Sequence, residues 1–129
     1  MSDTLNKYQK LKLKTEITRV MNSRDRTNAF PILVKYAFLE TSESDQYPVR
    51  VMVICGKRKF KKAVDRNRIK RLLKEAYRLN QSELNNLMIR KGKILGLSLM
   101  YTGEQMPTYE EVEHKIKICL GRLIKSIDK

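Results

Sequence analysis

The apolar residues of this chain follow two different repeats, and each repeat predicts its own kind of element. Within residues 5–21, the side chains Leu13, Ile17, Val20 and Met21 stand at i, i+4, i+7 and i+8. That spacing places them on one face of a helix. We therefore expect the chain to begin with an amphipathic helix.

Three apolar runs have the length and composition of strands, and they cover residues 29–39, 49–55 and 93–101. Pro31, near the start of the first run, favours an edge strand or a strand beginning. The second run, VRVMVIC, is apolar enough to be buried on both faces. The polar segments 22–28 and 40–48 indicate a loop and a turn. We expect the first two strands to form an antiparallel pair.

The helical repeat returns in two later segments. Residues 63–80 form the first, and residues 81–92 either continue that helix or break from it at Asn85–Asn86. The second begins at Thr108, and Glu111 three positions later completes the pattern of a capping box. Its apolar stripe consists of Val112, Ile116, Cys119, Leu120, Leu123, Ile124 and Ile127.

The predicted order is helix, strand, strand, helix, strand, helix, with room for one more short strand. It favours an α+β fold in which a central sheet is packed by helices. With 129 residues, the chain has the length of one domain with one core, which we assign to residues 1–129.

Several classes of function lack support in the sequence. Cys55 and Cys119 are each embedded in apolar residues, which favours two buried thiols. The single histidine, His114, and the absence of a Cys-x-x-Cys pair argue against a zinc site and against a histidine-assisted nucleophile. We expect His114 on the wet side of its helix. No run is apolar enough for a membrane span or a secretory signal, so we expect a cytoplasmic protein.

The positive charge of the chain is concentrated in one place. The net charge is +14, which indicates a polyanionic partner. Residues 57–78 hold eleven Lys and Arg against two acids, a net +9. Their first part, KRKFKK, is a basic loop, and the predicted helix 63–80 follows it.

A helical wheel separates two faces of the segment 63–80. The apolar face consists of Ile69, Leu72, Leu73, Ala76 and Tyr77. The opposite face consists of Asn67, Arg71, Lys74 and Arg78, with Arg68 and Lys70 at its flanks. Glu75 interrupts the charge and can pair with Arg71 at i, i+4.

This cationic face is more than a solvated surface, because a solvated helix face normally alternates the signs of its charges. Here the charges repel one another unless a polyanion neutralises them. Arginine offers forked donors that suit phosphate. The amide of Asn67 suits a base edge or a 2′-hydroxyl.

The stretch KKAVDRNRIKRLLKEAYR closely resembles the signature of the bacterial ribonuclease P protein subunit. That family has an Arg-Asn-Arg tripeptide followed by Ile-Lys-Arg and a Leu-rich turn, which here begins at Arg66. The segments LKLKTEITRVM, VRVMVICGKRK and PTYEEVEHKIKICLGRL are similar to the family's first helix, its strand before the basic loop, and its last strand-to-helix junction. The resemblance covers most of residues 11–125.

The resemblance implies a ribosomal-protein-like βαβ crossover, in which the Arg-Asn-Arg helix links two parallel strands of a mixed sheet. In this family the crossover is left-handed, whereas the general rule predicts a right-handed one. We adopt the left-handed crossover on the strength of the resemblance alone.

The resemblance also implies a function in a ribonucleoprotein endonuclease. The holoenzyme removes the 5′ leader of precursor tRNA with a catalytic RNA and magnesium ions, so we expect no catalytic residue and no metal site in the protein. DNA and membranes are not expected partners. The implied RNA-binding residues are Lys57, Arg58, Lys59, Lys61, Lys62, Arg66, Asn67, Arg68, Lys70, Arg71 and Lys74. The implied leader cleft contains Ile17, Met21 and Tyr36.

Two departures from the family pattern bear on these roles. The family often has phenylalanines where this chain has Ile17 and Met21, so leader binding would either depend more on Tyr36, Phe30 or Phe38 or be weaker. Ordinary core packing is the alternative role for Ile17 and Met21. The family's Ser-x-Ser-Lys run is replaced by Ile-Cys-Gly-Lys at 54–57, which removes the hydroxyls that could contact metal or phosphate.

Two other functions remain open on these residues. One is a general RNA-binding or ribosome-assembly protein on the same fold, which would associate with ribosomal RNA instead. The other is a DNA-binding regulator, but that function needs a helix-turn-helix, and residues 49–62 indicate a strand and a loop. A role at a membrane surface is weaker still, because the cationic helix has no free apolar face.

Overall fold

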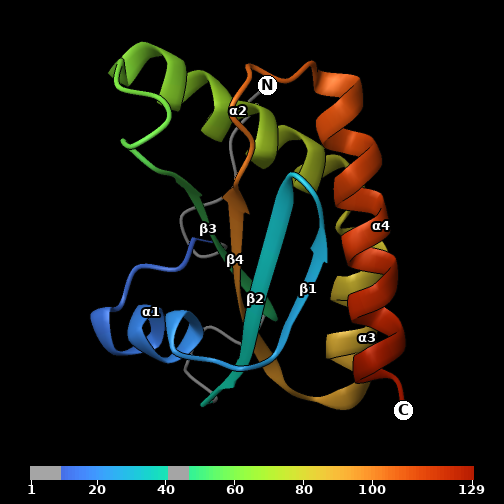
Figure 1. Cartoon of the computed structure of the whole chain (residues 1–129). Helices are drawn as coiled ribbons and strands as arrows, with labels where there is room; N and C mark the ends of the chain where they lie inside the picture. Colours follow the sequence, from blue (N-terminus) through green and yellow to red (C-terminus); the bar gives the residue numbers. More distant parts are fainter. Residues whose placement is uncertain (1–9, 41–46) are drawn as a thin grey trace.

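The computed structural model describes residues 10–40 and 47–129, and these residues form a four-stranded mixed sheet flanked by helices (Figure 1). Helix α1 lies on one face of the sheet, and α2, α3 and α4 pack on the other. The elements are α1 (Lys14–Met21), β1 (Arg26–Ala29), β2 (Ile32–Leu39), β3 (Val49–Cys55), α2 (Ala63–Asn80), α3 (Ser82–Lys91), β4 (Ile94–Tyr101) and α4 (Tyr109–Ile127). The α+β fold predicted from the sequence is confirmed.

The central position in the sheet belongs to β4, and this corrects the predicted strand pairing. The strand order is β1-β2-β4-β3, so β4 separates β2 from β3. It runs antiparallel to β2 and parallel to β3, and the crossover from β3 to β4 passes through α2 and α3. Burial explains the arrangement, because seven of the eight β4 residues are buried, as a strand covered on both faces requires.

Several element boundaries also differ from the prediction. Part of the polar segment 22–28 belongs to the short edge strand β1, whose residues are mostly exposed or half-buried and therefore lack an apolar signature. The helix after α2 begins at Ser82, three residues before the predicted break at Asn85. The predicted turn 40–48 and the start of the first helix, residues 5–9, lie wholly or partly outside the described residues. Leu13 precedes α1 and is 60% exposed, so it does not belong to the buried face.

The last helix follows the prediction closely. The Thr108 hydroxyl oxygen accepts a hydrogen bond from the backbone N–H of Glu111, and the Glu111 carboxylate accepts one from the backbone N–H of Thr108. This capping box begins α4, and its predicted stripe is buried except for the half-buried Ile124. His114 is exposed, as expected.

The two faces of the sheet carry two separate cores. Leu95, Leu97, Leu99 and Tyr101 alternate along β4 into the main core against α2 and α4. Leu11, Val20, Leu39 and Ile94 form a smaller core under α1. Cys55 and Cys119 are free thiols buried in the main core, as predicted, and burial raises the pKa of both. Within the described ranges, no helix is long and apolar enough to cross a membrane.

Two contacts add to the smaller core in holding α1 on its face of the sheet. The guanidinium of Arg50 on β3 donates to both carboxylate oxygens of Glu16, at 3.1 and 2.9 Å, and both side chains are largely buried. Gly96 on β4 leaves space for Val20, because a Cβ atom at Gly96 would lie 2.6 Å from the Val20 Cγ2 atom. The ion pair between Arg50 and Glu16 and the close packing of Val20 on Gly96 therefore help to position α1 over the sheet.

Candidate nucleic-acid interface

Helix α2 separates core residues from charged residues as the wheel predicts. Ile69, Leu73, Ala76 and Tyr77 are buried in the main core, whereas Leu72 is half-buried at its edge. The helix has no side-chain cap at Lys62, so its first backbone N–H groups add partial positive charge to the basic loop before it. The main core thus fixes a helix whose opposite side is cationic.

The predicted RNA-binding residues fall into two groups by exposure. Exposed are Lys57, Arg58, Lys59, Lys61, Lys62, Asn67, Arg68 and Arg71. Half-buried are Arg66, Lys70 and Lys74. The exposed group covers the loop and the outer side of α2, where a large partner has free access.

Arg66 has a structural contact that sequence reasoning did not identify. Its Nη1 atom donates to the carbonyl oxygens of Phe60 and Lys61, each at 2.8 Å. The ammonium of Lys59 donates to the carbonyl oxygen of Thr102 at 2.8 Å. These three bonds fix the basic loop to α2 and to the loop after β4, so its lysines are presented by an ordered backbone.

Glu75 on α2 pairs with a different arginine from the one predicted. Glu75 pairs with Arg78, with an Oε1 to Nη2 distance of 2.6 Å, instead of with Arg71. Arg71 has no ion-pair partner within the part of the chain that the structure describes. The pairing at the end of the helix therefore leaves Arg68, Lys70 and Arg71 without an acidic partner among the described residues.

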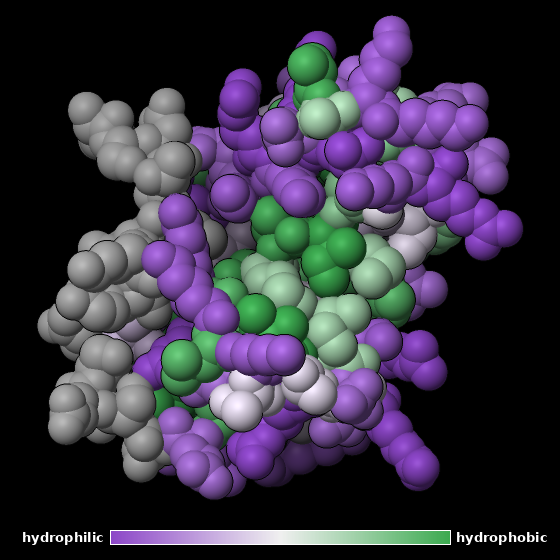
Figure 2. All heavy atoms as spheres, turned by 90° about the vertical axis from the view of Figure 1, so that its left-hand side faces the viewer, coloured by the Kyte–Doolittle hydropathy of each residue, from purple (hydrophilic) through white to green (hydrophobic). Residues whose placement is uncertain are grey.

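A second surface lies on the sheet face that carries α1. The strand register directs Leu33, Met52, Ile54 and Met100 to this face, and all four are half-buried. Figure 2 shows that face: hydrophobic residues gather in its centre, and hydrophilic side chains border them. We name these four residues the sheet-face patch.

Beside this patch lie two of the three residues predicted for the leader cleft. Ile17 packs against the smaller core, and Met21 is half-buried at the end of α1. The Met21 carbonyl oxygen accepts a hydrogen bond from the Lys35 ammonium at 3.1 Å, so a cation lies next to Met21.

The third predicted cleft residue, Tyr36, lies on the opposite face, so the structure does not bring it together with Ile17 and Met21. Tyr36 is opposite Leu97 in the sheet and packs against the main core, and Phe38 points to the same face as Tyr36. Its neighbour Lys35 takes the place on the α1 face, because successive side chains of a strand point to opposite faces. Phe30, the other aromatic considered, is exposed just after β1.

The patch ends in a pocket of about 230 Å³ below the basic loop. Its apolar lining includes Ile54, Phe60 and Met100, and its rim includes Arg58 and Lys59. The aromatic rings of Phe60 and Tyr101 close its inner side with centroids 5.9 Å apart. The sheet-face patch and the basic loop are therefore one continuous surface, apolar in the centre and cationic at the border.

The chemistry of this surface is that of binding. Among residues 10–40 and 47–129, no three His, Cys, Asp or Glu side chains are grouped as metal ligands. Exposed Arg and Lys attract phosphates, and half-buried apolar side chains offer contact to unstacked bases. This combination suits a nucleic acid with a single-stranded part.

Comparisons with known proteins identify the family of this chain. The model of the Ribonuclease P family matches residues 5–123. The ribonuclease P protein component of Porphyromonas gingivalis is 30% identical over 123 residues, which cover 95% of this chain and 88% of that protein. That of Chlorobaculum tepidum is 31% identical over 120 residues, covering 88% and 78%.

A solved structure gives the same fold. The Staphylococcus aureus RNase P protein superposes with a TM-score of 0.66 at 14% sequence identity, and the match covers 89% of this chain and 94% of that one. Fold, family signature and overall similarity to these relatives agree, and the chain belongs to the ribonuclease P family as a protein component of this ribonucleoprotein endoribonuclease.

Proposed function

We propose that this chain binds the catalytic RNA of ribonuclease P through α2 and the basic loop, and the 5′ leader of precursor tRNA across the sheet-face patch. The observation that carries the proposal is the division of α2, whose apolar side is fixed in the main core while its opposite side presents free cations. In the holoenzyme, the RNA and its magnesium ions cleave the leader, and the protein positions both RNAs in the cytoplasm.

Electrostatics supports the catalytic RNA as the partner of α2. The segment 57–78 carries a net +9, and the ion pair of Glu75 with Arg78 neutralises only its end. Arg68 and Arg71 are exposed and can bind phosphates as planar forks. If this surface contacts about six phosphates, log Kd should vary with log salt concentration with a slope of roughly 4 to 5.

The sheet-face patch suits a single strand. An extended leader presents unstacked bases, which need apolar contact, and phosphates, which need cations. Met52, Ile54 and Met100 supply the first, and Lys35 at the border supplies the second. Aromatic stacking contributes about 1–3 kcal/mol per base, and aliphatic or thioether side chains contribute less. We therefore expect leader binding that is modest and tolerant of sequence.

The alternation of side chains on β2 gives a sharp test of leader binding. Lys35 and Tyr36 are neighbours in sequence but point to opposite faces. In the reconstituted holoenzyme, Lys35→Gln should reduce the preference for leader-bearing precursor over mature tRNA. Tyr36→Phe, the control, should preserve that preference. If the preference survives Lys35→Gln and is lost in Tyr36→Phe, the leader binds on the opposite face of the sheet and this part of the proposal is wrong.

A further inference from the structure

A second pocket, of about 270 Å³, lies at the outer edge of β3 between that strand and α2. Lys10 forms an isolated parallel bridge with Val51, and the Leu11 N–H donates to the Val51 carbonyl oxygen at 2.9 Å. The segment before α1 thus extends the sheet beyond β3. The pocket is lined by Lys10, Leu11, Lys12, Val51, Met52, Val53, Lys70 and Lys74.

Among the described residues, the lining contains four lysines and no acid. None of their four ammonium groups has a hydrogen-bond or ion-pair partner among the residues that the structure describes. Burial, together with the nearby charges of Lys10 and Lys70, lowers the pKa of Lys74. The ammonium groups therefore repel one another across the pocket, and an anion placed among them would relieve that repulsion.

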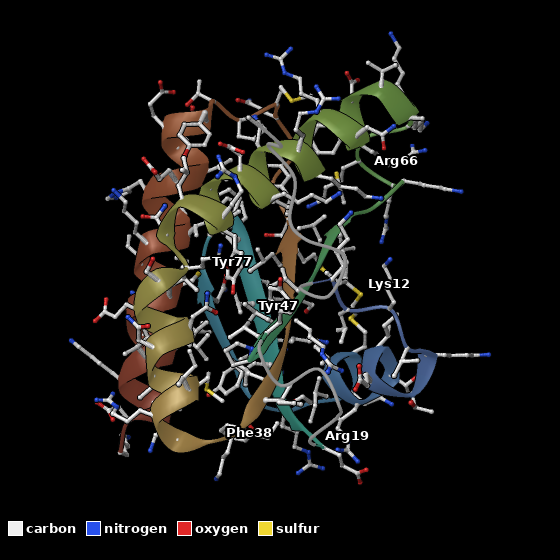
Figure 3. All side chains as sticks on the ribbon, turned by 180° about the vertical axis from the view of Figure 1, so that it is seen from behind. Lys12, Arg19, Phe38, Tyr47, Arg66 and Tyr77 are labelled. Atoms are coloured by element: carbon white, nitrogen blue, oxygen red, sulfur yellow. The ribbon has the colours of Figure 1, made fainter. Side chains whose placement is uncertain are left out.

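The two α2 lysines of this pocket are separated from the outer cations of the helix. Lys70 and Lys74 stand one turn apart and are half-buried beside β3, whereas Arg68 and Arg71 are exposed. In Figure 3, Lys12 lies between α1 and the first turns of α2. The chain thus brings cations from two distant segments, 10–12 and 70–74, to one pocket.

We propose that this pocket is a subsite for one nucleotide of an RNA strand, whose phosphate binds the four ammonium groups. Leu11, Met52 and Val53 provide an apolar floor for its sugar and base. A bare inorganic anion would use the lysines and leave this floor uncovered, so the lining favours a nucleotide over free phosphate. The subsite rests on the proposed function, because it assigns to the RNA partner a second contact beside the outer side of α2.

The test uses two probes on the full chain: a short single-stranded oligoribonucleotide and inorganic phosphate, each at constant ionic strength. Backbone amide chemical shifts of residues 10–12 and 51–53 report binding at the pocket. The double variant Lys70→Gln/Lys74→Gln removes two of the four cations. Lys91→Gln/Lys125→Gln, on exposed lysines of α3 and α4, makes the same change in net charge elsewhere.

The expected result is saturable binding of the oligoribonucleotide, weakened about tenfold or more in the pocket variant and little in the control. The pocket variant should also lower the steepness of the salt dependence by about 1 for each lost phosphate contact. Equal weakening by both variants would overturn the subsite, because it would show non-specific attraction. Phosphate binding as tight as that of the oligoribonucleotide would overturn it too.

Assembly with the catalytic RNA separates this inference from the proposed function. If the wild-type chain fails to bind that RNA, the proposed function is wrong. If the wild type binds but the pocket variant binds with the affinity of the control, only the subsite is wrong. Thermal unfolding of both variants shows that any loss is not a loss of fold.

Discussion

The guanidinium of Arg66 donates to the carbonyl oxygen of Phe60 at 2.8 Å, and this bond joins the first turn of α2 to the loop before it. A second bond from the same nitrogen reaches the Lys61 carbonyl oxygen at 2.8 Å. Arg66 therefore shapes the cationic surface, whereas Arg68, exposed two residues later, is free to contact RNA.

The two arginines should differ in what their loss changes. Arg66→Ala should lower the free energy of unfolding by about 1–3 kcal/mol, because it removes two charge-assisted hydrogen bonds, and should weaken RNA binding as well. Arg68→Ala should weaken RNA binding alone. Thermal unfolding and RNA titration of both variants check this. An Arg66→Ala protein that melts like the wild type would contradict the structural role.

Replacing Gly96 should displace α1. The added methyl group of Gly96→Ala would lie 2.6 Å from the Val20 Cγ2 atom and 3.1 Å from the Leu39 Cδ1 atom. We expect a loss of about 1–3 kcal/mol in urea unfolding from this overpacking. In the Gly96→Ala background, Val20→Ala should lower the free energy of unfolding less than it does in the wild type, because it relieves the overpacking. A double-mutant cycle measures this difference as a coupling energy.

Gly121 gives a matched control for Gly96. A Cβ atom at Gly121 would have no neighbour within 4 Å, and the residue lies inside α4. Gly121→Ala should therefore stabilise the protein by about 0.5–1 kcal/mol through helix propensity. Equal effects of the two alanines would mean that the close contact between Gly96 and Val20 is not formed.

The ion pair between Glu16 and Arg50 should hold α1 over the sheet. Glu16→Gln removes the Glu16 carboxylate from the largely buried Arg50 guanidinium, so we expect a loss of up to about 3–5 kcal/mol in urea unfolding. Hydrogen exchange should accelerate in α1 in particular. Glu104→Gln, at an exposed position, should change neither quantity. Unchanged exchange in α1 would exclude this role of the pair.

Replacing Tyr77 with phenylalanine should stabilise the protein. Its hydroxyl is buried without a hydrogen-bond partner in the described residues, and burial raises its pKa well above the usual range. Tyr77→Phe should raise the free energy of unfolding by about 1–3 kcal/mol, since it removes an unsatisfied polar group. Tyr109→Phe is the contrasting variant, because the Tyr109 hydroxyl donates to Glu113 at 3.0 Å, and its loss should destabilise.

The pH dependence of Tyr77→Phe has a definite sign. The pKa of Tyr77 is higher in the folded than in the unfolded chain, so this group makes stability depend on pH only above the unfolded pKa. Above about pH 10, the unfolded tyrosine ionises and the wild type loses stability from this site, whereas the variant does not. The stability difference between the two proteins should widen from neutral to alkaline pH. A constant difference would contradict the burial of that hydroxyl.

The sequence predicted most reliably what depends on local spacing. The bounds of α2 match the prediction because its apolar repeat and its polar face lie within one helix. The capping box of α4 was equally predictable, because Thr108 and Glu111 are three residues apart. The Arg-Asn-Arg signature then indicated the family, which no local pattern of charge could have done.

What the sequence could not predict depends on contacts between distant segments. The pairing of β4 with both β2 and β3 is set by which strand must be buried on both faces, and VRVMVIC and KILGLSLMY are alike in that respect. The run ILVKYAFL is apolar almost throughout, so it does not show which of Lys35 and Tyr36 faces α1. The four-lysine pocket joins segments 10–12 and 70–74, which no sequence pattern connects.

Reconstituted cleavage tests the central claim most directly. Single-turnover 5′ cleavage of precursor tRNA by the catalytic RNA at low magnesium should be strongly stimulated by the wild-type protein. The Arg68→Ala/Arg71→Ala variant, folded to the same melting temperature, should stimulate much less, and the protein alone should not cleave. Absence of stimulation by the wild type, or full stimulation by the variant, would contradict the assignment of α2 as the surface that binds the catalytic RNA.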